Sequence, residues 1–257
     1  RHVYLLRSSE VRVAQWGVQV LPTVKGHKAT IALNTTIESF AKQNRKLSVR
    51  QSLYDAEGRR VAQSVTGCVA RMGKTTVNQR LNVSHAKLWW PNAPHIYKVI
   101  TELMAGREVI DRDTTTMGLR TIAFDATTGF SINGQPTKLN GVCLHGDLGC
   151  LGTAINEDAL YRQLRMMKEM GANAIRCAHN PPAPELLNCD TMGLMVIDEA
   201  FDQWRVGKTE FDYALFFDKW AERDLTDMVL RDRNHPSIIL WSIGNEVLEQ
   251  WNTTKNQ

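Results

Sequence analysis

Apolar and polar residues alternate along residues 1–117 with the period of two that is typical of half-buried β-strands. The stretch "ATIALNTTI" places alternate residues on one face, namely Ile31, Leu33, Thr35 and Ile37. "YKVITEL" repeats the pattern, and turn signals such as Glu57-Gly58 and Ala105-Gly106 separate the runs. About seven short strands at this spacing predict an all-β immunoglobulin-like sandwich over residues 1–117.

After Gly118 the period changes to that of helices between strands. "NEDALYRQLRMMKEMG" predicts a helix with Asn156 as its N-cap and Gly171 at its end. Its inner stripe is expected to contain Leu160, Leu164, Met167 and Met170. "APELLNCDTMG" predicts a shorter helix, and a longer one is expected from about Asp212 to Asp232.

Near-continuous apolar strands alternate with these helices. An Asn133-Gly134 hairpin signal comes first, followed by strands in "GVCLH", "ANAIRCAH", "LMVIDEA" and "IILWSIGNEV". This order predicts a parallel sheet with both faces covered. Only four strand–helix units fit in residues 118–257, whereas a (β/α)8 barrel needs about 250 residues. The predicted fold is therefore multi-domain: the sandwich, then the N-terminal half of an α/β (β/α)8 TIM barrel over residues 118–257.

Polar side chains gather at the carboxyl ends of all four predicted strands. In chain order they are His145 and Asp147, then Arg176, His179 and Asn180, then Asp198 and Glu199, and finally Asn245 and Glu246. The carboxyl ends of parallel strands meet at one rim, where barrels of this kind assemble their active sites. We therefore expect these groups to form a site.

Glu246 is the strongest chemical candidate because it follows a strand that is too apolar to be exposed. We expect its carboxyl group in a partly desolvated cleft, where a carboxyl keeps its proton to higher pH and can act as a general acid. The alternative is a salt-bridged loop carboxylate.

Charge is spread unevenly along the chain. The total of 31 Lys and Arg against 27 Asp and Glu gives +4, but residues 1–117 carry 18 − 8 = +10 and residues 118–257 carry 13 − 19 = −6. The basic residues of the first half are scattered, without a basic-aromatic motif, so a solvated sandwich face is favoured and no nucleic-acid partner is expected. No apolar run is long enough to span a membrane.

The five cysteines are too few and too scattered to indicate a disulfide framework, and the lack of a C-x-x-C pair argues against a structural zinc site. The first residues, "RHVYLLRSSE", include no initiator Met and no apolar signal-peptide core. We expect a fragment of a longer protein, and the sequence therefore does not indicate a compartment.

Four motifs together resemble glycoside hydrolase family two, and its β-galactosidase-like members most: "LNGVCLHGDLG", "NAIRCAHNPPAPELL", "GLMVIDEAFDQW" and "RDRNHPSIILWSIGNE". They stand in the family's order and cover essentially all of residues 118–257. Over residues 1–117 the resemblance rests on the position and length of the sandwich. The family's enzymes combine a jelly-roll, an immunoglobulin-like domain and a catalytic barrel.

The resemblance implies retaining hydrolysis by two carboxylates about 5–5.5 Å apart. Glu246 corresponds to the acid/base, and Asn245 to the neighbour that binds the sugar's 2-hydroxyl. Arg176 corresponds to an arginine that supports the nucleophile, while His145 and His179 correspond to histidines of the sugar subsite. The nucleophile is expected beyond Gln257, at the end of a seventh strand.

Other interpretations remain open for these residues. Asp147 is a candidate for sugar-hydroxyl recognition, with Asn180 as a further substrate-binding residue. The two histidines could instead be structural, and Arg176 could serve only in salt bridges. For Asp198 and Glu199 we favour hydrogen bonding over a metal site, and Trp204 could stack on a sugar or anchor its loop.

Departures from the family pattern include Gly146 in place of a second histidine, and Cys177 and Ala178 in place of small hydroxyl residues. The magnesium ligands of some relatives have no match in "FDQWRVGK". No metal or other cofactor is therefore expected.

The resulting hypothesis is a fragment of a retaining β-glycosidase that hydrolyses terminal β-galactosides in carbohydrate catabolism and is inactive by itself. A β-glucuronidase of the same family is the alternative, followed by a non-catalytic carbohydrate-binding or structural protein. The expected partner is a β-linked sugar, and the full-length enzyme could be a homo-oligomer.

Overall fold

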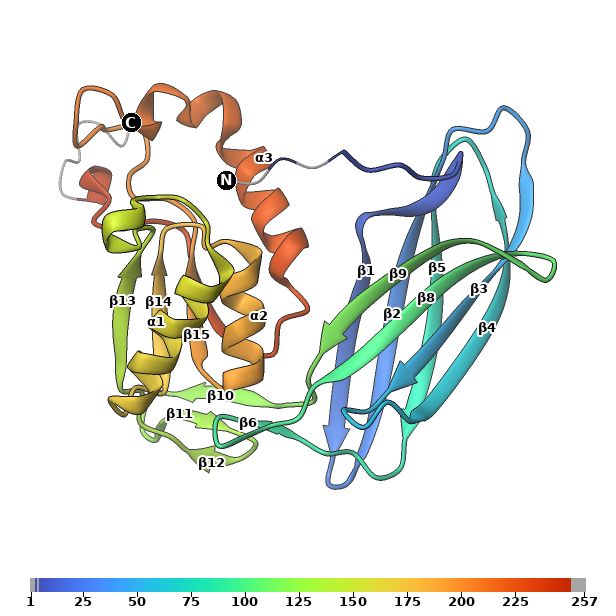
Figure 1. Cartoon of the computed structure of the whole chain (residues 1–257), viewed down its shortest axis with the longest axis horizontal. Helices are drawn as coiled ribbons and strands as arrows, with labels where there is room; N and C mark the ends of the chain where they lie inside the picture. Colours follow the sequence, from blue (N-terminus) through green and yellow to red (C-terminus); the bar gives the residue numbers. More distant parts are fainter. Residues whose placement is uncertain (1–2, 4, 251–257) are drawn as a thin grey trace. The chain divides into compact units, whose positions relative to one another are not determined.

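The protein is described by a computed structural model that covers Val3 and residues 5–250 (Figure 1). The chain divides into two compact units. Within the described residues, one unit comprises Val3–Thr137 together with Asn234–Pro236, and the other comprises Lys138–Arg233 and residues 237–250.

The first unit contains seven long strands in two antiparallel sheets. One sheet has the order β1 (Val11–Lys25), β2 (Lys28–Ser39), β5 (Gly73–Val83). The other has the order β4 (Arg60–Ala70), β3 (Arg45–Tyr54), β8 (Tyr97–Ala105), β9 (Glu108–Met117). One apolar core contains side chains from both sheets. The predicted immunoglobulin-like sandwich is confirmed.

In β2 and β8, the alternate residues that were predicted to share one face all point into the core. The inward residues are almost fully buried, namely Ile31, Leu33, Thr35, Ile37, Tyr97, Val99, Thr101 and Leu103. The two buried threonines are satisfied by one amide, because Gln51 Nε2 donates to Thr35 Oγ1 (2.8 Å) and to Thr101 Oγ1 (3.2 Å). This contact removes the cost of leaving those polar groups unpaired in an apolar interior.

Short strands complete the first unit. β6 (Trp89–Trp90) pairs with β7 (Ala93–Pro94), and β10 (Ile122–Asp125), β11 (Gly129–Ile132) and β12 (Gln135–Pro136) form a small antiparallel sheet. The predicted hairpin joins β11 to β12. Asn133 and Gly134 both have positive φ, 50° and 78°, as the two central residues of a type I′ turn require.

The second unit is a sheet of four parallel strands in chain order: β13 (Gly141–His145), β14 (Ala174–Ala178), β15 (Met195–Glu199) and β16 (Ile238–Ser242). The helices are α1 (Glu157–Glu169), α2 (Ala183–Met192) and α3 (Phe217–Asp232). Short 3-10 turns lie at η1 (Gly149–Leu151), η2 (Tyr213–Leu215) and η3 (Leu248–Gln250). Within the described residues the sheet is not closed, as predicted for an incomplete barrel.

The two faces of this sheet differ in character. Ile175 of β14 and Val196 of β15 pack with Leu164 of α1 and Leu186 of α2, and Figure 1 shows both helices over one face. Successive side chains of a strand point to opposite faces. Arg176, which follows Ile175, therefore points away from α1 and α2.

Two helix predictions need correction. The N-cap is confirmed, since Asn156 Oδ1 accepts the Ala159 N–H at 2.9 Å, but the inner stripe ends at Met167. Met170 is 68% exposed because α1 ends at Glu169 and Met170 is its C-cap. The third helix begins at Phe217, five residues later than predicted, because Asp212 instead caps the preceding 3-10 turn.

Candidate functional site

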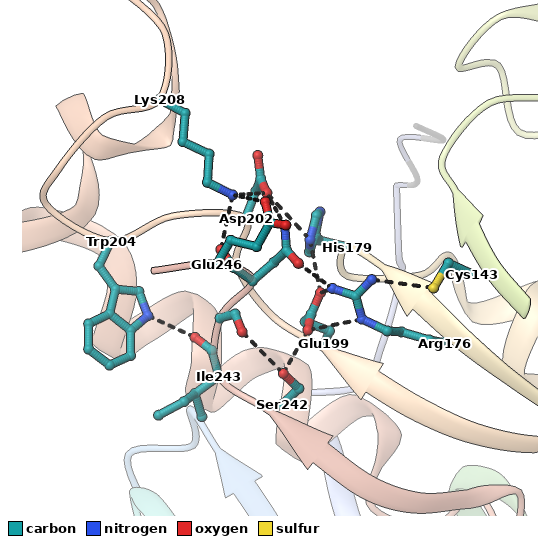
Figure 2. Close-up of polar contacts among 12 residues, drawn as sticks. Cys143, Arg176, His179, Glu199, Asp202, Trp204, Lys208, Ser242, Ile243 and Glu246 are labelled. Atoms are coloured by element: carbon teal, nitrogen blue, oxygen red, sulfur yellow. Dashed lines mark hydrogen bonds and ion pairs between the residues drawn. The ribbon is translucent and has the colours of Figure 1, made fainter. Parts of the chain in front are cut away.

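Arg176 lies at the centre of a polar cluster at the carboxyl ends of the parallel strands (Figure 2). Its Nη2 donates to Glu199 Oε1 and to Asn245 Oδ1, both at 2.6 Å. Its Nη1 lies 3.4 Å from Cys143 Sγ. The strand register explains the meeting, because Cys143 pairs with Arg176 across β13 and β14 and alternation places Glu199 on the same face.

Glu199 is the most buried carboxylate of this cluster, with a side chain that is 4% exposed. Its Oε2 accepts the Ser242 hydroxyl at 2.7 Å and Arg176 Nε at 3.3 Å. A buried carboxylate is tolerated when it is paired and hydrogen-bonded in this way. The hydrogen-bonding interpretation of Glu199 is therefore confirmed.

His179 lies beside two carboxylates. Its Nε2 is 2.9 Å from Glu199 Oε1, without the alignment of a hydrogen bond, and 3.8 Å from Asp202 Oδ1. Burial lowers the pKa of His179 from its ordinary value and outweighs the attraction of the two carboxylates for a proton. The neutral imidazole is thus favoured near pH 7.

Asp202 and Lys208 belong to the cluster although neither was predicted. Asp202 Oδ1 accepts Asn245 Nδ2 and Lys208 Nζ, both at 2.8 Å. Burial opposes ionisation, but the hydrogen bonds from Lys208 and Asn245 hold the pKa of Asp202 below its ordinary value. Both residues stand in "FDQWRVGK", the segment noted above only for its lack of magnesium ligands.

Glu246 does not have the predicted environment. Its side chain is 80% exposed, and its Oε2 lies 3.7 Å from Lys208 Nζ. The prediction that the Glu246 carboxyl lies in a partly desolvated cleft is wrong for the described residues, because most of this side chain is in contact with solvent. The neighbouring residue does lie in the cluster, since Asn245 bonds to Arg176 and Asp202.

The predicted sugar-binding residues other than Asn245 line two cavities. His145 and Asp147 line one of about 330 Å³ with residues of α1 and α2, and Asp147 Oδ1 accepts the Gly149 N–H at 3.1 Å. His179 and Asn180 line another of about 390 Å³. The structure thus brings Arg176, His179 and Asn245 into one cluster, and places His145 and Asp147 in a different cavity.

Trp204 anchors its loop. Its Nε1 donates to the Ile243 carbonyl at 2.9 Å, and its ring lies near Phe217. A Cβ at Gly244 would lie 2.8 Å from Trp204 Nε1 and 2.6 Å from Val247 Cγ2. A larger residue at position 244 would therefore require Val247 or Trp204 to shift.

Within residue 3 and residues 5–250, no three His, Cys, Asp or Glu side chains lie together as a metal site requires. In the same part of the chain, no helix combines the length and apolar character needed to cross a bilayer.

Comparison with known families covers both units. Residues 11–120 match the model described as glycosyl hydrolases family 2, and residues 126–256 match the model of that family's TIM barrel domain. The chain belongs to glycosyl hydrolase family 2. The resemblance drawn from the four motifs is confirmed.

Family 2 relatives show similarity along nearly all of the chain. The β-galactosidase BoGH2A of Bacteroides ovatus is 50% identical over 258 residues, which cover 99% of this chain and 30% of that protein. Among solved structures, a family 2 member from Bacteroides cellulosilyticus has a TM-score of 0.92 at 38% identity, covering 96% of this chain and 32% of that one.

A β-glucuronidase of Bacteroides uniformis is also similar. Its structure has a TM-score of 0.84 at 26% identity, and the match covers 97% of this chain and 31% of that one. The chain thus spans less than a third of the length of each of these three relatives.

Proposed function

We propose that this chain is part of a retaining β-glycosidase that hydrolyses terminal β-galactosides, with Glu246 as its general acid/base. The observation that carries the proposal is the 50% identity to a β-galactosidase over 99% of the chain. The nucleophilic carboxylate is supplied by residues outside this chain.

In this proposal Glu246 protonates the departing glycosidic oxygen and then deprotonates the water that attacks the glycosyl-enzyme. One feature of the structure supports the role. Glu246 follows β16 at the rim where barrels of this fold place catalytic residues.

Asn245 is proposed to bind the sugar's 2-hydroxyl. Arg176 donates a hydrogen bond to the amide oxygen of Asn245, and the amide nitrogen of Asn245 donates one to Asp202. A carbonyl oxygen has two lone pairs and an amide nitrogen two hydrogens. One acceptor site and one donor site therefore remain for a hydroxyl, in an orientation set before the sugar binds.

Arg176 is proposed to support the nucleophile, and four other side chains to contact the sugar, namely His145, Asp147, His179 and Asn180. Their positions at the carboxyl ends of β13 and β14 favour this role. The fixed Arg176 guanidinium supplies positive charge on the face that holds Glu199. Such charge stabilises a second carboxylate nearby.

A β-glucuronidase is the second candidate, favoured by the similarity to the Bacteroides uniformis enzyme. The experiment compares the full-length protein on nitrophenyl β-galactoside and nitrophenyl β-glucuronide. We expect galactoside turnover that falls at least about 100-fold in Glu246→Gln, the usual scale of general acid–base catalysis. The control is Glu222→Gln on exposed α3 surface. If the protein hydrolyses only the glucuronide, the proposed substrate changes from a β-galactoside to a β-glucuronide.

We further propose that the 257-residue chain does not hydrolyse glycosides by itself. The described sheet has four strands, whereas a closed barrel of this type has eight. Turnover by the purified chain that Glu246→Gln abolishes would contradict this.

A further inference from the structure

Lys208 is a largely buried cation that contacts three groups of the candidate site. Its side chain is 21% exposed. Its Nζ lies 2.8 Å from Asp202 Oδ1, 3.0 Å from the Asn245 carbonyl oxygen and 3.7 Å from Glu246 Oε2, as Figure 2 shows in part. One ammonium group therefore bridges the loop after β15 and the segment after β16.

The backbone at Lys208 is held independently of its side chain. Asp212 Oδ2 accepts the N–H groups of Lys208 (2.7 Å) and Thr209 (2.9 Å), while Oδ1 accepts that of Ala214 (2.9 Å). These hydrogen bonds, above all the one from Thr209, lower the pKa of Asp212. The carboxylate therefore stays ionised and continues to accept the backbone N–H groups of the loop. The long, flexible lysine stem thus starts from a fixed point.

The contacts of Lys208 fall on both the backbone and the carboxylate of the acid/base segment. Glu246 has φ of 46°, a left-handed conformation that is uncommon for a residue with a side chain. The bond from Lys208 to the Asn245 carbonyl fixes the peptide that leads into this conformation. The same ammonium lies within ion-pair distance of the Glu246 carboxylate, which has abundant rotamer freedom because it is exposed.

We propose that Lys208 is a positioning residue for the acid/base, holding the Asn245–Glu246 backbone and drawing the Glu246 carboxylate to the place where it meets the glycosidic oxygen. The inference rests on the proposed function. It assigns Lys208 a role in proton transfer to the leaving group. A lysine that only neutralised Asp202 would affect all substrates equally.

The test uses the full-length enzyme and aryl β-galactosides whose leaving groups range from dinitrophenol, which departs without a proton, to phenol, which needs one. Lys208→Met removes the ammonium and keeps the stem. We expect its kcat/KM to fall about 30-fold or more on the phenyl substrate and less than about 3-fold on the dinitrophenyl substrate, a share of the usual general-acid contribution. Lys208→Arg keeps the charge and is expected to restore most of the phenyl activity.

The control is Lys219→Met, an exposed lysine of α3 that lies over the Trp220 ring. It is expected to leave both rates unchanged. If Lys208→Met does not fold, Lys208→Gln serves instead, because it retains a donor for Asp202 and the Asn245 carbonyl while lacking the charge. An equal loss on all substrates, or no loss, would overturn the inference.

Glu246→Gln measured on the same series separates the two proposals. If Glu246→Gln shows no dependence on the leaving group, the proposed acid/base function fails. If Glu246→Gln is selective for poor leaving groups and the Lys208 variants are not, only the positioning role fails.

Discussion

Arg176 and Asn245, 69 residues apart in the sequence, are joined by a 2.6 Å hydrogen bond from Nη2 to Oδ1. The same Nη2 also donates to Glu199. This one guanidinium therefore connects β14, β15 and the segment after β16.

Arg176→Ala should destabilise the unit that contains β13–β16. The substitution leaves the Glu199 carboxylate, 4% exposed, without its main cationic partner. Removing one member of a buried ion pair costs about 3–5 kcal/mol. Hydrogen exchange of the β14 and β15 amides in the 257-residue chain measures the loss locally. Arg165→Ala, which removes a mostly exposed i,i+4 pair with Glu169, is the control and should cost less than about 0.5 kcal/mol.

Gly244→Ala should strain the segment that holds the acid/base. The added methyl group would lie 2.6 Å from Val247 Cγ2 and 2.8 Å from Trp204 Nε1. Overpacking of this kind costs about 1–3 kcal/mol. Gly146→Ala meets no atom within 4 Å and should be nearly neutral. Equal unfolding free energies for the two variants, measured by urea titration, would show that the segment after β16 relaxes freely.

Burial of His179 predicts a pH dependence of stability. Its pKa is lowered from the ordinary value of about 6.5, so below that pH the unfolded chain binds a proton that the folded chain binds less well. The contribution of neutral His179 to the free energy of unfolding is therefore fully present above about pH 6.5, and it is lost as the pH falls through the folded-state pKa. Urea unfolding between about pH 8 and about pH 5 should show this slope.

His179→Gln should flatten that slope, whereas His85→Gln, on an exposed loop of the sandwich unit, should leave it in place. A slope that persists in His179→Gln would assign the pH dependence to other groups.

The strands and the rim were predictable because periodicity and strand polarity are properties of neighbouring residues. β2 and β8 needed only alternation. Arg176 and Glu199 share a face because Arg176 pairs with Ile197 and Glu199 follows two residues later. The exposure of Glu246 was not predictable in this way. Residues 238–241 of β16 are all apolar, but Ile238 is 4% exposed and Leu240 38%, because burial depends on what packs over each side chain.

Lys208 and Asp202 were missed for a different physical reason. Both belong to the irregular segment between β15 and α3, where no period relates sequence position to side-chain direction. Their contacts arise because Asp212 folds this loop back on itself through hydrogen bonds to its own backbone. A carboxylate four residues after a lysine in a loop is too common to indicate such a turn.

The most direct test of the assignment of Glu246 is the product formed by Glu246→Ala of the full-length enzyme from nitrophenyl β-galactoside in the presence of azide. Without its carboxylate the enzyme cannot activate water, so turnover should fall at least about 100-fold. Azide needs no deprotonation and can displace the enzyme's nucleophile from the anomeric carbon, so we predict restored turnover with β-galactosyl azide as product. Undiminished hydrolysis by Glu246→Ala without azide would contradict the assignment.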